Sequence, residues 1–262
     1  MTLAQLVVGA DHDAARTAAC EVLDAARDAG AALVVLPEYA SGFDPRGVGH
    51  EHAEPLDGPF VTALRDRARA TGVAVLAGVT LPGSTPDRAV NAVVAVAADG
   101  ALVGHYRKVH LYDAFGHRES DRLEPGPAGA PPLVLDVAGL RVGVMTCYDL
   151  RFPESARRLV DAGADVLTVP AAWVAGPGKA AQWEALAVAR AIENTCAVLA
   201  VGQAGRGVTG TSLAVGADGR VLERLGTAPG LLTVDVHGDA IAAVRAQNPS
   251  LVNRRYTVVP RG

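Results

Sequence analysis

Apolar runs of strand length alternate with alanine-rich stretches of helical length along nearly the whole chain of 262 residues. The run at 32–37, Ala-Leu-Val-Val-Leu-Pro, is continuously apolar, which is typical of a strand covered on both faces. One helix is predicted after Asp11 or Asp13, ending near Asp28. Further helices are predicted at about 60–70, 153–162 and 180–194. Buried strands that alternate with helices indicate a layered α/β fold.

Three hairpins are also predicted, because a two-residue turn separates each of three pairs of apolar runs. The turns are Asp99-Gly100, Ala138-Gly139 and Asp218-Gly219. No linker, low-complexity run or break in composition divides the chain. Residues 1–262 are therefore predicted to form a single domain.

Charge and hydropathy disfavour several functions. The net charge is −4 and acids and bases are interspersed, so no basic surface for nucleic acid or an anionic membrane is expected. The longest apolar runs are too short to cross a bilayer, and the first residues lack the pattern of a signal peptide. Cys20, Cys147 and Cys196 are odd in number and scattered, which suits free thiols in the cytoplasm. Small-molecule chemistry is the resulting expectation.

Three ionisable residues stand where an apolar strand gives way to a loop: Glu38, Lys108 and Cys147. In open α/β sheets, binding groups gather at the carboxyl ends of strands. A thiol is mostly protonated at pH 7, so it needs a base or a cation to become a nucleophile. Glu38 can serve as this base, and Lys108 can stabilise the thiolate and a developing oxyanion.

Each member of this trio also has a structural interpretation. A cysteine is often simply buried, a glutamate after Leu-Pro is often a solvated cap, and Lys108 can belong to an ordinary charged surface. The shared placement at strand ends favours catalysis, but the spacing alone leaves both interpretations open.

Three longer segments carry a resemblance to a known family. They are Leu-Pro-Glu-Tyr at 36–39, Tyr-Arg-Lys-Val-His-Leu-Tyr-Asp at 106–113 and Gly-Val-Met-Thr-Cys-Tyr-Asp-Leu-Arg-Phe-Pro-Glu at 143–154. In this order they resemble the motif blocks of the nitrilase superfamily, the carbon–nitrogen hydrolases. Similarity continues at 169–173, 182–194 and 210–222, so the resemblance covers nearly the whole chain. It implies a four-layer αββα sandwich of two sheets flanked by helices.

The resemblance also implies a role for each residue of the trio. Glu38 matches the general base, Lys108 the stabiliser of the oxyanion, and Cys147 the nucleophile. Glu119 best matches a second active-site glutamate of the family, and Glu124 is the weaker candidate. The implied reaction is attack of the thiolate on an amide carbonyl, followed by hydrolysis of the thioester. Neither a metal nor an organic cofactor is required.

Residues near the cysteine are expected to support this chemistry. The backbone N–H of Tyr148 is the expected second oxyanion donor. A helix starting near Pro153 is expected to direct its positive end towards the sulfur and favour the thiolate. Arg151 is interpreted mainly as a scaffold residue that can pair with a carboxylate, with a direct substrate role as the lesser alternative. Glu184 is a candidate hydrogen-bond partner for the lysine or its surroundings, with packing or solvation as an equal alternative.

The segments around the cysteine also bear on the substrate. Nitrilases usually carry Trp-Glu after the cysteine, whereas this chain has Tyr148-Asp149. The segments at 147–154 and 182–194 look most like those of omega-amidases and deaminated-glutathione amidases, which act on small carboxylated amides. The candidate substrate contacts are Tyr148, Tyr39, Trp173 and the loop Ala114–Arg118. Tyr39 and Trp173 can equally be core residues.

Other functions stay open on the sequence alone. Hydrolysis of an N-carbamoyl amino acid or amine uses the same residues and releases carbon dioxide with the ammonia. Nitrile hydrolysis is a weaker alternative. A noncatalytic protein of the same fold is disfavoured, because Glu38, Lys108 and Cys147 are all present.

Three other features are given lesser roles. Gly-Arg-Gly-Val-Thr-Gly at 205–210 fits a dinucleotide-binding pattern, but a hairpin follows it instead of a helix. Gly-His-Glu-His at 49–52 is interpreted as a solvated loop, because no further ligand completes a zinc site. His110 is a weak candidate for a residue that supports the catalytic groups from the rim of the active site.

The resemblance implies a homodimer or a higher homo-oligomer. It implies contact through helices beside the cysteine, and the C-terminal segment at about 246–262 is a further candidate for the interface, since the stretch at 248–260 contains apolar residues.

Overall fold

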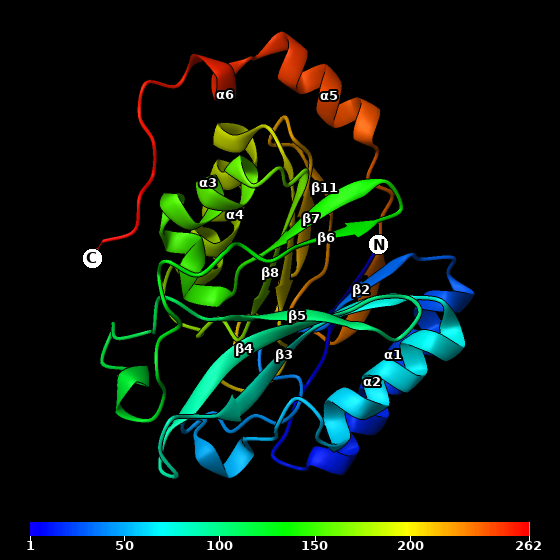
Figure 1. Ribbon diagram of the computed structural model, residues 1–262, viewed down its shortest axis with the longest axis vertical. Coiled ribbons are helices and arrows are strands. Elements are labelled where there is room, and N and C mark those ends of the chain that lie inside the picture. The colour runs from blue at the N-terminus through cyan, green and yellow to red at the C-terminus, as the bar shows by residue number, and fades with distance from the viewer. Residues whose placement is uncertain (262) are drawn as a thin grey trace.

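The computed structural model describes residues 1–261 and contains two six-stranded sheets that pack face to face (Figure 1). The first sheet has the strand order β12-β1-β2-β3-β4-β5. Its strands are β1 (Thr2–Gln5), β2 (Leu33–Val35), β3 (Ala74–Pro82), β4 (Ala89–Val96), β5 (Leu102–Arg107) and β12 (Gly230–Thr233). Helices α1 (His12–Asp28) and α2 (Pro59–Thr71) cover the outer face of this sheet (Figure 1).

The second sheet has the order β11-β10-β9-β8-β7-β6. Its strands are β6 (Val134–Val137), β7 (Leu140–Val144), β8 (Val166–Ala171), β9 (Ala197–Gly202), β10 (Leu213–Val215) and β11 (Val221–Arg224). Helices α3 (Pro153–Asp161) and α4 (Lys179–Asn194) cover its outer face (Figure 1). The expected αββα sandwich is therefore confirmed.

The remaining helices are short or peripheral. Three 3₁₀ helices, η1 (His50–His52), η2 (Glu119–Asp121) and η3 (Cys147–Arg151), lie in the loops. Helices α5 (Gly238–Gln247) and α6 (Ser250–Asn253) follow β12, the last strand of the chain, near the C-terminus. No helix within residues 1–261 is both long and apolar enough to cross a membrane.

Strand β2 shows how one apolar run supports two layers. Val34 packs into the cluster beneath α1 and α2, whereas Leu33 and Val35 pack into the cluster between the two sheets. Successive side chains of a strand point to opposite faces, so a strand covered on both sides must be apolar throughout. This explains the continuous run that the sequence shows there.

The predicted helices and hairpins are confirmed, and the structure decides between the two candidate caps of α1. The Asp11 carboxylate accepts hydrogen bonds from the N–H groups of Asp13 (2.9 Å) and Ala14 (3.0 Å). The glycine-rich segment 205–210 is a loop followed by β10, as expected. His52 does not lie in a solvated loop; it is buried, with its Nδ1 3.0 Å from Nε2 of His12.

The strand directions bring the predicted trio together. Strand β4 runs antiparallel to both of its neighbours, so β5 points the same way as β2 and β3. The carboxyl ends of β2 and β5, which Glu38 and Lys108 follow, therefore share one edge. In the other sheet, parallel strands β7 and β8 lead to Cys147 and Ala172. The Ala172 N–H donates to Glu38 Oε2 (2.7 Å), so the edges of the two sheets meet at this site.

Candidate active site

Lys108 joins two carboxylates at the floor of the site. Its Nζ lies 2.9 Å from Glu38 Oε1 and 2.9 Å from Glu119 Oε2. The lysine side chain is 2% exposed, so both contacts are shielded from water. The structure thus places Glu119, not Glu124, beside the lysine. Glu124 accepts hydrogen bonds from Ser84 outside this cluster.

Glu38 is held by donors from both sheets. Its Oε1 accepts from Asn91 Nδ2 (2.7 Å), in addition to the contact with Lys108, and its Oε2 accepts from the Ala172 N–H. The backbone of β3 passes so close that a Cβ on Gly78 would lie 2.4 Å from the Glu38 Cα. A glycine at this position is what allows the close approach.

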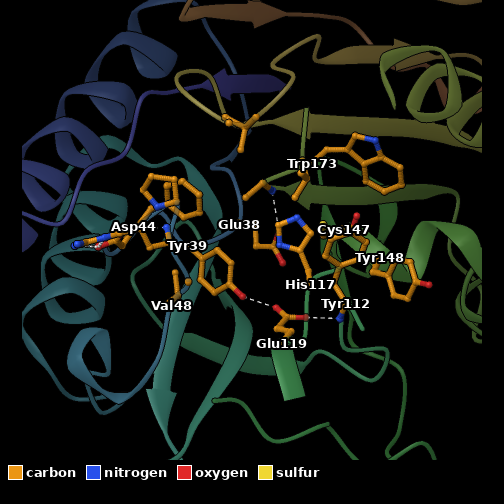
Figure 2. A pocket seen from close by; sticks show the side chains of 18 of the residues that line it. Glu38, Tyr39, Asp44, Val48, Tyr112, His117, Glu119, Cys147, Tyr148 and Trp173 are labelled. Carbon is orange, nitrogen blue, oxygen red and sulfur yellow. Dashed lines mark hydrogen bonds and ion pairs between the residues drawn. The ribbon is translucent and has the colours of Figure 1, made fainter. Parts of the chain in front are cut away.

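Glu119 is fixed by a second set of donors (Figure 2). The Tyr39 hydroxyl donates to its Oε1 (2.5 Å) and the Tyr112 N–H donates to its Oε2 (2.6 Å). Asn91 Nδ2 lies 3.3 Å from the same Oε1 and so bridges the two glutamates. Both acids are therefore held in place before any substrate arrives.

The charges of the cluster stabilise one another. Burial alone would lower the pKa of Lys108, but the Glu119 and Glu38 carboxylates raise it well above its ordinary value. Burial alone would raise the pKa of Glu119, but the Lys108 ammonium and the hydrogen bonds from Tyr39 and Tyr112 lower it. Lys108 and Glu119 are thus both charged at neutral pH.

Cys147 is the first residue of η3, at a strained turn just after β7. Its φ is 46°, in the left-handed region that non-glycine residues rarely adopt. Asp149 pins the turn by accepting from the Thr146 N–H (3.0 Å) and the Tyr106 hydroxyl (2.7 Å). His110 Nδ1 lies 2.7 Å from Asp149 Oδ1, so His110 reaches the site only through this aspartate.

The resting state of the thiol differs from the expected thiolate. Burial and the Glu38 carboxylate raise the pKa of Cys147 well above its ordinary value, and the Lys108 ammonium only partly opposes them. Two carboxylates outnumber the single ammonium, so a further negative charge on sulfur is unfavourable. The expected helix is present as α3, but it begins only after the 3₁₀ helix η3, whose first residue is Cys147. The raised pKa therefore favours the protonated thiol in the resting state.

One cavity of about 360 Å³ is lined by Glu38, Lys108, Glu119 and Cys147 (Figure 2). Tyr148 and Trp173 line it too, as does Tyr39, so all three predicted substrate contacts border the cavity. Tyr39 also holds Glu119, and Trp173 also packs beside Trp183 with ring centroids 5.2 Å apart. From the predicted loop 114–118, His117 and Arg118 reach the cavity.

The structure differs from one supporting role predicted from the sequence and decides another that the sequence left open. Arg151 pairs with no carboxylate within residues 1–261; it donates to the Gln182 amide oxygen (2.7 Å) and lies over aromatic rings. Glu184 forms an ion pair with Arg224 (3.2 Å) and has no contact with Lys108. The helical period of α4 directs Glu184 to the surface, which a motif match does not reveal.

Asn91 is the main residue that the sequence analysis missed. It is fully buried at the start of β4 and donates to both glutamates. Gln203 was missed as well, and its amide donates to the Glu38 carbonyl oxygen (3.0 Å). A polar residue in an otherwise apolar strand is the one available signal, because a buried amide must find partners.

No group of three or more His, Cys, Asp or Glu side chains in the described chain is arranged to hold a metal ion. The chemistry available in the cavity is that of a thiol, two carboxylates and an ammonium. This combination supports covalent catalysis, because a base can take the thiol proton while a cation stabilises an oxyanion.

A layered α/β scaffold with such a pocket defines a class of hydrolases that act through a thiol. The chain belongs to the carbon–nitrogen hydrolase family, whose model matches residues 3–246. It is therefore an enzyme that hydrolyses carbon–nitrogen bonds other than peptide bonds.

The sequence is similar to several curated amidases. The deaminated glutathione amidase of Escherichia coli O157:H7 is 40% identical over 226 residues, covering 86% of this chain and 85% of the relative. The deaminated glutathione amidase of Mus musculus is 36% identical over 258 residues, covering 92% and 78%, respectively.

Solved structures show the same fold. A CN-hydrolase superfamily protein from Xanthomonas campestris, with an arsenic adduct in its active site, has a TM-score of 0.87 and 28% identity. The match covers 99% of this chain and 98% of that protein. A mutant amidase from Nesterenkonia sp. AN1, in which acrylamide has added to the active-site cysteine, has a TM-score of 0.79 and 28% identity. That match covers 94% of this chain and 96% of the amidase.

Proposed function

We propose that this enzyme hydrolyses a small carboxylated amide of the deaminated-glutathione type through a thioester on Cys147. The observation that carries the proposal is the contact of Lys108 with both Glu38 and Glu119 in the cavity that Cys147 lines. The curated relatives named deaminated glutathione amidases support this substrate type.

In the first half of the reaction, Glu38 takes the proton of the Cys147 thiol as the sulfur attacks the amide carbonyl carbon. The carbonyl oxygen becomes an oxyanion, stabilised by Lys108 and by the backbone N–H of Tyr148. This N–H lies in the first turn of η3, where N–H groups have no intrahelical partner. The C–N bond then breaks, and the leaving nitrogen takes the proton from Glu38. Ammonia or an amine departs and the thioester remains.

In the second half, Glu38 takes a proton from water, whose oxygen attacks the thioester carbon. The C–S bond breaks, the carboxylic acid leaves, and the sulfur regains the proton from Glu38. Glu119 keeps the charge of Lys108 and fixes its position throughout both halves. Coupling deprotonation to attack suits a thiol whose pKa is raised by its surroundings.

The proposal is tested by weighing the intact protein after rapid mixing with a panel of amides. We expect a transient adduct with the mass of the acyl group, which disappears as free acid accumulates. A nitrile is assayed beside the panel, which consists of deaminated glutathione, simple omega-amides and N-carbamoyl amino acids. Carbon dioxide release from the last group alone would replace the amidase proposal with a carbamoylase, and a nitrile-only profile would indicate a nitrilase.

We propose further that the enzyme acts as a homodimer or a higher homo-oligomer in the cytoplasm. A reducing compartment keeps its three free cysteines reduced. At the C-terminal segment, Val252, Tyr256 and Val259 are 84%, 90% and 74% exposed. Three exposed apolar side chains in one segment support the proposal that a partner covers this segment.

Truncation after residue 247 is expected to convert the oligomer to a monomer. The reason is that it removes these apolar side chains while leaving both sheets and α5 intact. Light scattering on the full chain and the truncated chain measures the change. An arginine substitution at Tyr256 provides a milder variant, and an unchanged mass for both would contradict the proposed interface.

A further inference from the structure

The chain contains only two lysines, Lys108 and Lys179, whereas its other basic side chains besides histidine are 22 arginines. Both lysines line the cavity that contains Cys147. The charge of Lys108 is balanced by the carboxylates of Glu38 and Glu119. Lys179 has no role in the steps described so far.

Lys179 is built into the cavity wall. It is the first residue of α4 and is 7% exposed. Its Nζ donates to the Tyr112 hydroxyl (2.8 Å) and lies 3.6 Å from the centroid of the Phe115 ring. The Trp173 indole N–H donates to the Lys179 carbonyl oxygen (3.0 Å), which anchors the start of α4. An ammonium has three donors, so capacity remains for another acceptor.

Within residues 1–261, Lys179 forms no ion pair with a carboxylate, and neither does its neighbour Arg151. The other cations of the cavity wall do have such partners. The pairs are Arg46 with Asp44 (2.6 Å), Arg118 with Asp121 (3.3 Å) and Arg122 with Glu51 (3.0 Å). Lys179 is therefore a buried cation whose own chain supplies only a hydroxyl and aromatic rings.

A buried ammonium without an anion is held at a free-energy cost. Burial and the nearby Arg151 guanidinium lower the pKa of Lys179. A carboxylate bound at Nζ would offset both effects and form a charge-assisted hydrogen bond. The anion that this site lacks can come from the substrate.

The charges along the cavity would also orient such a substrate. At the floor, Glu38 and Glu119 outnumber the single cation Lys108, so a carboxylate is repelled there. Around Lys179, the electrostatic potential is positive, because Arg151 lies nearby and the amino-terminal end of α4 adds to it. A substrate held by its carboxylate at Lys179 presents its uncharged amide to Cys147.

We infer that Lys179 binds a carboxylate of the substrate and thereby selects carboxylated amides over neutral ones. This inference rests on the proposed amidase function and names the residue that recognises the charged end of the substrate. Tyr112 orients the ammonium, and the Arg151 guanidinium, which lies over the Trp173 ring, adds to the positive potential.

The kinetic test compares succinamate with butyramide, which has a methyl group in place of the carboxylate. Lys179→Met is expected to raise KM for succinamate about 10- to 100-fold, the size of a hydrogen bond to a charged group. We expect kcat/KM for butyramide to stay within about twofold, and Lys179→Arg to recover part of the selectivity. Arg224→Met, which removes one surface cation, is the charge-matched control and should match wild type on both substrates.

If Lys179→Met lost kcat/KM equally on both amides, or lost none on either, the inference would be overturned. A binding measurement keeps the test independent of turnover. With ¹⁵N-labelled lysine, the spectrum contains two side-chain signals, which Lys179→Met assigns. Succinate is expected to raise the pKa of Lys179 and shift its signal, while butyramide leaves it unchanged.

The kinetic comparison and the succinate titration together distinguish a failure of this inference from a failure of the proposed function. If wild type cleaves neither amide and Cys147 never gains an acyl mass, the proposed function fails for these substrates. The succinate titration then decides carboxylate binding by itself. A Lys179 signal that does not respond to succinate would sink the inference even in an active enzyme.

Discussion

Replacing Cys147 with alanine should abolish amide hydrolysis, lowering kcat by a factor on the order of 10⁶. Without the sulfur no thioester forms, and the remaining groups can only bind the substrate and polarise its carbonyl. The fold should persist, because alanine fits the space of the thiol and adopts the same backbone. Release of ammonia or amine measures the loss, and intact mass should show no acyl adduct.

Cys196 provides the matched control. It is also buried, and burial raises its pKa to about 12, but it does not line the cavity. Cys196→Ala should therefore keep the wild-type kcat even if its melting temperature falls. Turnover retained by Cys147→Ala would contradict the thioester mechanism outright.

Replacing Lys108 with methionine should reduce both activity and stability. Loss of the cation removes an oxyanion-stabilising group, which costs a factor of about 10² to 10³ in kcat. It also leaves Glu38 and Glu119 buried together without a counter-charge. Breaking a buried ion pair in this way typically costs about 3–5 kcal/mol in the free energy of unfolding. Urea unfolding and steady-state kinetics measure the two effects.

The pH dependence of the stability lost in Lys108→Met shows whether the charge of the lysine or the packing of its side chain is responsible. In wild type the folded-state pKa of Glu119 lies below its ordinary value of 4.5, so its contribution to stability is present above that pH and is lost on acidification. Without Lys108, burial and Glu38 should raise this pKa instead. The stability deficit of Lys108→Met should therefore be largest near pH 7 and shrink towards pH 5.

A double variant supplies the control for this prediction. Lys108→Met combined with Glu119→Gln removes one negative charge along with the cation, so part of the stability should return while activity stays low. A deficit that is independent of pH, with no recovery in the double variant, would show that packing of the lysine stem matters more than its charge.

Much of the scaffold was predictable because its signals are local. Asp11 caps α1 through groups two and three residues away, and the three hairpins follow from their turns. Strand β12 and helix α5 were not predicted. Strand β12 is a four-residue edge strand paired with β1 across almost the entire chain, and α5 buries only Ile241. Neither presents a local pattern strong enough to be distinguished.

The residues of the site likewise divide into those that the sequence indicates and those that it does not. Glu38, Lys108 and Cys147 were indicated by their placement at strand ends and by the family resemblance, and Glu119 by the resemblance alone. Asn91 and Lys179 were not, because each depends on partners far away in the sequence. Asn91 donates to Glu38 across 53 residues, and Lys179 meets Tyr112 across 67.

The sequence by itself determined the order of strands and helices as far as β11 and which side chains stand at strand ends. Only the tertiary structure decided how many acids surround Lys108, and hence that the raised pKa of Cys147 favours the protonated thiol at rest. It also decided which lysine has carboxylate partners and which has none. The physical reason is that hydrogen bonds within a turn act between neighbours in the chain. The pKa of a buried group depends instead on every charge that folding brings near it.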